Sequence, residues 1–584
     1  MLAITALTSL AGACSSTGML PEPTDTPAPQ DTPPLAEEAR ADVDTTRLTP
    51  EPERYGNFTR EQLTALILGE LGGQRGHMDD AAERYYHLAL DTRDLAIVRR
   101  AAEYNAAAGN NQRTLTLTDQ WIELAPDDEA PYLMRSYHRL QNNDFLAAMD
   151  DMASVLELGG AADFTALSAR SPGLDDATRR QIRERLKALR EQHPGEPSLH
   201  YALAQMLDQA GDPEAAHAVL DEARERFGET PRLLIVEAQR LQNLQQQGRA
   251  LELLQQGVER FPGHRLLRHN LARILLQADE LQRAREQFTE LLRRSPGDLE
   301  SLYSLALINV ELAADREAGR QLQALVSAGY RSNEALYYLG MLAERNRAPE
   351  QALQWYSGIE RGANVFLAGQ RQALRLLTGR GEHDEARQWS QRVSDRHPDM
   401  TALMNTLEAE ALLNAGEQAR AATLLDEALE QFPDNVDLLF ARTTLNEQRD
   451  RPEAVARDLR RILRLEPDNV RALNHLGYSL TVHTDRYEEA LELIGEAIEL
   501  EPDDPAIIDS LGWVQFKLGQ LDDALHNLER AYAMFPNHEV AAHLGEVLWV
   551  RGERERAMTI WEEGLDEEPD SEYINDAMER LVHQ

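Results

Sequence analysis

The fold is decided by residues 505–536, which read PAIIDSLGWVQFKLGQLDDALHNLERAYAMFP. Apolar and small residues recur here at spacings of three and four in two runs, which predicts two amphipathic helices. Gly519 lies between the runs, and Pro536 ends the second one. Gly512 and Ala524 are small enough to let the two helix axes approach closely. Such a pair cannot cover its own apolar face, so the pattern predicts a copy on each side.

Copies of this pair follow at regular intervals that prolines mark. Successive prolines near the C-terminus are 34, 35, 34 and 33 residues apart, at Pro433, Pro467, Pro502, Pro536 and Pro569. The same ladder continues backwards through Pro398, Pro296, Pro262 and Pro194. A Leu-Gly pair recurs in the first run of four units, at Leu339-Gly340, Leu476-Gly477, Leu511-Gly512 and Leu544-Gly545. The sequence therefore contains a repeat of about 34 residues.

A 34-residue helix–turn–helix repeat with these small and bulky positions resembles the tetratricopeptide repeat (TPR) family. The resemblance is specific over about 190–570 and weaker over about 60–190. It implies an all-α fold, a TPR helix-hairpin solenoid that forms a right-handed superhelix.

Length and charge agree with a repeat array that binds proteins. The 584 residues exceed what one compact core usually holds, whereas repeats pack only on their neighbours. Asp and Glu number 100 against 60 Lys and Arg, a net charge of −40. A surface of this sign repels phosphate backbones and anionic headgroups, so we expect no nucleic acid among the partners.

The first residues resemble a bacterial lipoprotein signal. Residues 1–13, MLAITALTSLAGA, are apolar and end in small residues directly before Cys14, the single cysteine of the chain. The resemblance implies that Cys14 is lipidated, and Ser15 after it is typical of lipoproteins on the periplasmic face of the outer membrane. The alternative is an ordinary apolar leader with an incidental cysteine. The run is too short to span a membrane, so we expect membrane attachment only through the lipid anchor.

The remaining chain divides by composition. Residues 14–57 contain the lipidated cysteine and a Pro-rich segment that cannot bury a core, which predicts a disordered tether. Residues 58–193 are predicted to form degenerate helical repeats, with a distorted unit or loop near 160–180, where Pro172 interrupts the pattern. Residues 194–569 form the predicted TPR array, and 570–584 a helix that caps it.

Catalytic motifs are missing from the sequence. It has no phosphate-binding glycine loop, no His-Glu-x-x-His and no nucleophile elbow. The pairs His264/His269 and His538/His543 are five residues apart, which does not place two metal ligands on one helix face. We therefore expect no enzyme, no cofactor and no metal site.

The resemblance to TPR proteins also indicates which side chains face the concave wall, through positions five, nine and twelve of each first helix. In the last three repeats these are Asn474, Tyr478, Asp509, Trp513, Phe516 and Trp549. Aromatic groups beside amides and carboxylates suit protein capture. Earlier repeats place Tyr201, His269, Tyr303, Tyr337 and Phe440 at position five. The alternative is that these aromatic side chains pack between neighbouring repeats.

Residues 470–561 are similar to the C-terminal repeats of a proteobacterial group of TPR outer-membrane lipoproteins, the LbcA group. The resemblance implies an adaptor that binds a periplasmic carboxyl-terminal processing protease and presents peptidoglycan hydrolases to it. One alternative is an envelope assembly lipoprotein that organises an outer-membrane secretion or polysaccharide-export machine. An enzyme with accessory repeats is disfavoured, because the repeats leave no region of about 100 residues for a catalytic domain.

Overall fold

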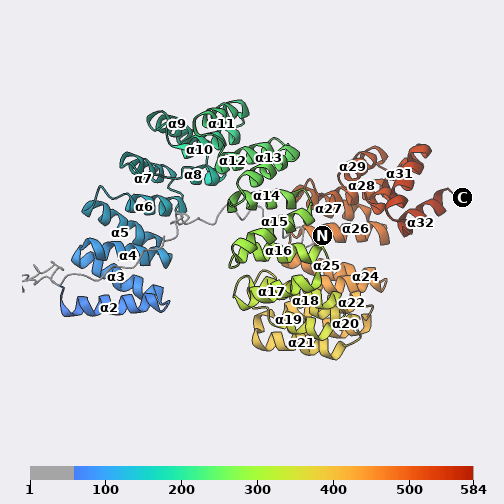
Figure 1. The fold of residues 1–584 in the computed structure, drawn as a ribbon. Helices are drawn as coiled ribbons and strands as arrows, with labels where there is room; N and C mark the ends of the chain where they lie inside the picture. Colours follow the sequence, from blue (N-terminus) through green and yellow to red (C-terminus); the bar gives the residue numbers. More distant parts are fainter. Residues whose placement is uncertain (1–57, 583–584) are drawn as a thin grey trace, which may run out of the picture. The chain divides into compact units, whose positions relative to one another are not determined.

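The structure, a computed structural model, describes residues 58–582. This part of the chain is built from helices joined by short turns, and it contains no strand (Figure 1). The chain divides into two compact units within helix α17 (Asp315–Ser327), the first ending at Gln321 and the second beginning at Leu322. Cys14, the predicted signal segment and the predicted tether lie outside the described residues.

The helices of the first unit mostly pack against the next helix in the chain, as the first described helix does with the second and the second with the third. They are α2 (Arg60–Gln74), α3 (Met78–Thr92), α4 (Leu95–Ala107), α5 (Asn111–Leu124), α6 (Ala130–Gln141), α7 (Phe145–Glu157), α8 (Thr165–Arg170), the 3-10 helix η1 (Ser171–Gly173), α9 (Asp176–Gln192), α10 (Pro197–Gln209), α11 (Pro213–Phe227), α12 (Pro231–Asn243), α13 (Gln247–Arg260), α14 (Arg265–Gln277), α15 (Leu281–Arg294) and α16 (Leu299–Glu311).

The second unit continues the same alternation. Its helices are α18 (Ser332–Arg345), α19 (Pro349–Ser357), α20 (Phe366–Gly379), α21 (His383–Arg396), the 3-10 helix η2 (Pro398–Met400), α22 (Thr401–Asn414), α23 (Gln418–Gln431), α24 (Val436–Gln448), α25 (Pro452–Leu465), α26 (Val470–His483), α27 (Tyr487–Leu500), α28 (Pro505–Lys517), α29 (Leu521–Met534), α30 (His538–Val550), α31 (Arg554–Glu567) and α32 (Glu572–Leu581).

The proline ladder marks the places where one hairpin ends and the next begins. Shortly after a ladder proline, an Asn or Asp side chain caps the next first helix, as Asn469 does for α26 and Asp504 for α28. Each accepts hydrogen bonds from backbone amides of the first turn, which have no partner inside the helix. Within the hairpin formed by α28 and α29, the turn runs through Gly519, whose φ of +77° favours glycine. The repeat boundaries are therefore set by local chain chemistry.

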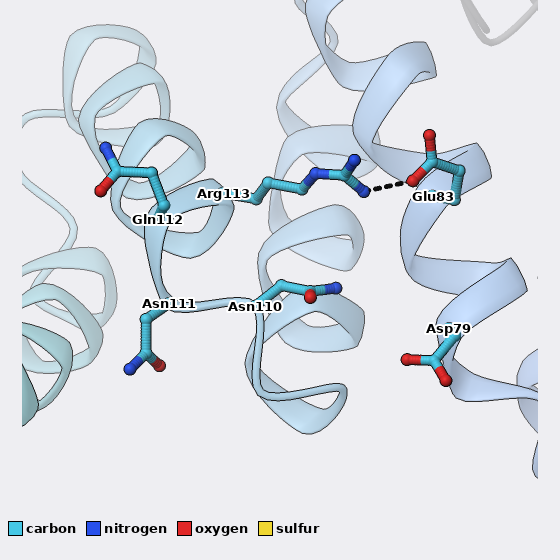
Figure 2. Close-up of a pocket in the computed structure, with 6 residues that line it drawn as sticks. All are labelled: Asp79, Glu83, Asn110, Asn111, Gln112 and Arg113. Carbon is cyan, nitrogen blue, oxygen red and sulfur yellow. Dashed lines mark hydrogen bonds and ion pairs between the residues drawn. The ribbon is translucent and has the colours of Figure 1, made fainter.

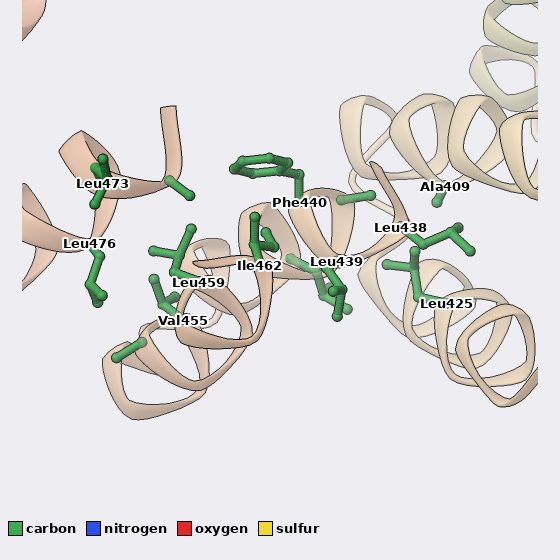
Figure 3. Packing of buried hydrophobic residues seen from close by; sticks show 14 of the residues in the cluster. Ala409, Leu425, Leu438, Leu439, Phe440, Val455, Leu459, Ile462, Leu473 and Leu476 are labelled. Carbon is green, nitrogen blue, oxygen red and sulfur yellow. The ribbon is translucent and has the colours of Figure 1, made fainter. Parts of the chain in front are cut away.

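Apolar contacts hold neighbouring hairpins together. In the second unit one continuous cluster runs from α22 to α28, and successive helices contribute Ala409, Leu425, Leu439, Leu459 and Leu476 to it (Figure 3). First helices also contact the first helix of the next repeat, as α26 does with α28 and α28 with α30. Contacts of this nearest-neighbour kind are what a helical solenoid requires, so the predicted all-α helix-hairpin solenoid is confirmed.

The irregular stretches fall where the repeat pattern weakens. Around Pro172 the chain forms the six-residue helix α8 and the 3-10 helix η1 in place of a full-length helix. Helix α9 then packs directly against α10. The helices are therefore in contact across 193/194, the predicted boundary between degenerate repeats and the TPR array, and the two compact units divide elsewhere. Helix α32 contacts both α30 and α31. None of the described helices is long and apolar enough to cross a membrane.

Candidate functional site

A groove with a volume of about 660 Å³ crosses three consecutive first helices of the second unit, α26, α28 and α30. The N-terminal halves of these helices and the turns before them line it. Of the six side chains predicted for the concave wall, Asn474, Tyr478 and Asp509 line this C-terminal groove. The repeat stacking thus brings together residues that are one period apart in the chain.

Tyr478 is fixed in the groove by a hydrogen bond across two repeats. Its hydroxyl donates to Glu539 Oε1 at 2.8 Å, although the two residues are 61 positions apart. Burial raises the pKa of Tyr478, and the nearby Glu539 carboxylate raises it further. The phenol therefore remains a neutral donor that positions Glu539.

Asp509 forms a buried ion pair with His543, which lies 34 residues later at the next repeat. His543 Nδ1 donates to Asp509 Oδ2 at 2.9 Å and lies 3.0 Å from Oδ1, and each residue is only 5% exposed. Burial lowers the pKa of His543, but the Asp509 carboxylate outweighs it, so the pKa lies above its usual value. The pair joins α28 to α30, and the Asp509 carboxylate is already satisfied within the fold.

Trp513 is buried rather than presented on an open wall. Only 6% of it is exposed, because its indole stacks on the His543 ring with centroids 4.1 Å apart and planes at 19°. The Phe516 ring also stacks with the indole, with ring centroids 5.3 Å apart, and Lys517 Nζ lies 4.2 Å from the Trp513 ring centroid. Burial lowers the pKa of Lys517. The neighbouring repeat therefore covers much of the face of Trp513, and its predicted role in protein binding stays a prediction.

Phe516 and Trp549 are half-buried and lie outside the C-terminal groove. Trp549 stacks on Trp561 with ring centroids 5.8 Å apart, and the Arg554 guanidinium lies 5.0 Å from its ring. Both aromatic side chains keep an exposed edge, but much of each ring contacts its own or the adjoining hairpin. Their proposed role in protein binding stays a prediction.

The aromatic residues at position five of earlier repeats are mostly interior. Those that are buried are Tyr201, Tyr303, Tyr337 and Phe440, whereas His269 is half-buried. Tyr201 donates or accepts a hydrogen bond at 2.9 Å with Thr230 of the following hairpin. The buried side chains agree with the alternative interpretation, in which these residues pack between neighbouring repeats.

Several residues of the C-terminal groove were not singled out from the sequence, among them Arg471, Glu501, Phe535 and Glu539. Most lie in or near the turn that precedes a first helix. The rule used for the concave wall covers only positions five, nine and twelve within the helix. The sequence did contain a signal for the contact between His543 and Asp509. His543 stands 34 residues after Asp509, one repeat period, on the next first helix.

A second cavity, of about 490 Å³, lies in the first unit between α3 and the start of α5 (Figure 2). Its lining is polar, with Asp79 and Glu83 on one side and Asn110 to Arg113 on the other. Arg113 is bonded to Glu83, so these opposite charges already neutralise each other. Neither here nor elsewhere in the described part of the chain are three His, Cys, Asp or Glu side chains placed to hold a metal ion.

Comparison with known proteins finds the repeat in both units. One model of tetratricopeptide repeats matches residues 246–308 and 515–581, and another matches 183–231, 316–364 and 443–505. The TPR repeat-containing protein PA4667 of Pseudomonas aeruginosa is 41% identical over 546 residues, which cover 93% of this chain and 90% of that protein.

Other similarities are more distant. Bacteriophage adsorption protein A of Escherichia coli K12 is 30% identical over 138 residues, 24% of this chain and 14% of that protein. The solved structure of Naa15/Naa10 bound to HypK-THB is 16% identical and covers 68% of this chain and 67% of the solved one, with a TM-score of 0.35.

Proposed function

This chain belongs to the tetratricopeptide-repeat family and is a protein-interaction scaffold, and from that premise we propose that it is a membrane-anchored adaptor for proteolysis. It binds a carboxyl-terminal processing protease and presents cell-wall hydrolases to that protease as substrates. The proposal adds a class of partner and a place in the cell to the general scaffold role.

The observation that carries the proposal is the C-terminal groove. It opens across three consecutive repeats and lies within 470–561, the stretch in which we infer a resemblance to the LbcA group of adaptors. Its lining mixes an exposed aromatic ring, Phe535, with amide and carboxylate groups, including Asn474 and Glu539. Such a lining suits a protein segment better than a small apolar ligand.

The proposed anchor gives the scaffold a physical reason to accelerate another enzyme. A lipid on Cys14 would hold the solenoid at the periplasmic face of the outer membrane. Two proteins bound to one frame meet at an effective concentration that the frame sets, without any new contact between them. An adaptor of this kind raises the rate of proteolysis while contributing no catalytic group.

Reconstitution tests the proposal. The full chain, the processing protease of the same organism and one of its cell-wall hydrolases are mixed in detergent, and hydrolase degradation is followed over time with and without the chain. We expect the chain to bind the protease and to accelerate degradation. If it does neither, the adaptor role is wrong. Affinity capture from solubilised envelopes would then test the alternative, an assembly lipoprotein for a secretion or polysaccharide-export machine.

A further inference from the structure

The C-terminal groove contains a hydrogen-bond acceptor that the described residues leave without a donor. Asn474 Oδ1 is buried there and has no hydrogen-bond partner among the described residues. A buried acceptor without a donor is costly unless a ligand supplies one. An extended peptide carries a backbone N–H at every residue other than proline, which is a donor of the right kind.

The charges in the groove are also unequal. Of its cationic groups, His475 bonds to Glu447, whereas the Arg471 guanidinium lies 4.1 Å from the centroid of the Phe440 ring and forms no ion pair within residues 58–582. Neither Glu501 nor Glu539 forms an ion pair within these residues, and both line the groove. Two unpaired carboxylates against one unpaired guanidinium leave the groove with a net negative charge.

Two phenols lie close to the Glu539 carboxylate of the groove. The pKa of Tyr573 on α32 is raised first by the Glu539 carboxylate and then by burial. The pKa of Tyr478 is raised by burial and by Glu539. Since a basic group would relieve this concentration of negative charge, the groove favours a cationic ligand.

An apolar contact lies beside these acceptors. Phe535, in the turn before α30, is 56% exposed and lines the groove together with Ile507 and Val540. An exposed aromatic ring beside carboxylates that form no ion pair suits a segment in which apolar and basic side chains alternate. A second copy of this chain is a poor occupant by charge, because its net charge is −40.

We propose that the C-terminal groove binds an extended segment of a protein partner that carries a Lys or Arg side chain. The basic side chain pairs with Glu539, a backbone N–H of the segment donates to Asn474 Oδ1, and an adjacent apolar side chain packs on Phe535. This inference rests on the scaffold role under Proposed function and names the chemistry of the segment that the scaffold selects.

Fluorescence polarisation of labelled peptides tests the inference with the full chain in detergent. The probes are an eight-residue peptide of Ser, Ala and Leu with two Lys residues, and its twin with two Glu residues. We expect the Lys peptide to bind at least about ten times more tightly than the Glu peptide, and to weaken as salt rises.

Variants separate the groove from the acidic surface in general. Glu539→Gln keeps an acceptor for the Tyr478 hydroxyl but removes the charge, and we expect it to weaken binding of the Lys peptide about three- to tenfold. Asn474→Ala should weaken binding of both peptides by a similar factor, because it removes the backbone acceptor. The matched control is Glu562→Gln, an exposed carboxylate on α31 outside the groove, which should leave binding unchanged.

Equal binding of the two peptides, or an equal effect of Glu539→Gln and Glu562→Gln, would overturn the inference. Thermal scans of each variant identify loss of folding, and Glu539→Gln alone is sufficient if Asn474→Ala unfolds. The assay contains no protease and no hydrolase. If the groove binds the Lys peptide as expected but reconstitution fails, the inference about the groove stands and only the adaptor role is wrong.

Discussion

The two helices of a hairpin approach most closely where a glycine of the first helix faces a bulky side chain of the second, and this contact can be tested at Gly545. Gly545 lies on α30 opposite Trp561 of α31, which is fully buried. A Cβ at position 545 would lie 2.2 Å from Trp561 Nε1 and 2.5 Å from Cε2, whereas ordinary van der Waals contact begins at 3.4 Å. The indole cannot move away freely, because Trp549 stacks on it.

The expected effect of Gly545→Ala follows from two opposing terms. Overpacking of a core costs about 1–3 kcal/mol, and this overlap with a rigid ring belongs at the upper end. Replacing a mid-helix glycine by alanine gains about 1 kcal/mol of helix propensity. The net result should be a loss of about 2 kcal/mol. The matched control is Gly495→Ala on α27, where a Cβ meets nothing within 4 Å, so that variant should gain about 0.5–1 kcal/mol.

Repeat arrays open locally, so the assay must report on this hairpin. Hydrogen exchange of the α30 and α31 amides, followed by mass spectrometry of their peptides, measures the local opening free energy in both variants. Protection should fall in Gly545→Ala and hold or rise in the α27 peptides of Gly495→Ala. If both variants are stabilised alike, the close contact at Gly545 does not limit packing and the reasoning fails.

Three further predictions address the site and the anchor. Trp513→Ala should destabilise the C-terminal repeats by about 3–5 kcal/mol, because it removes a buried indole that stacks on His543, and a wild-type thermal midpoint would contradict this. The buried pair of His543 and Asp509 stabilises the fold fully below about pH 6.5, the usual histidine pKa, and this contribution is lost as the pH rises through the raised pKa of His543. Denaturant midpoints from pH 5 to 9 should therefore fall more for wild type than for His543→Gln, and parallel curves would exclude the pair as their cause. Cys14→Ser should release the protein from the membrane fraction, whereas a wild-type protein that is already soluble on fractionation would rule out the anchor.

Much of the fold was accessible from the sequence because hairpins form from local signals. The runs within 505–536 became α28 and α29, and the turn between them passes through Gly519. Asn and Asp side chains such as Asp504 begin the next helix shortly after a ladder proline. These signals act within a few residues of one another, so a single repeat contains them all.

The candidate site depended on contacts between repeats, which no single repeat contains. Trp513 satisfies the position rule for the concave wall, yet the ring of His543 from the next hairpin covers its face. Tyr478 obtains its partner, Glu539, from two repeats further along. The 34-residue spacing of the repeats was sufficient to place these residues on first helices. Only the tertiary structure decided which of them are exposed, because burial depends on the side chain that the neighbouring repeat places opposite.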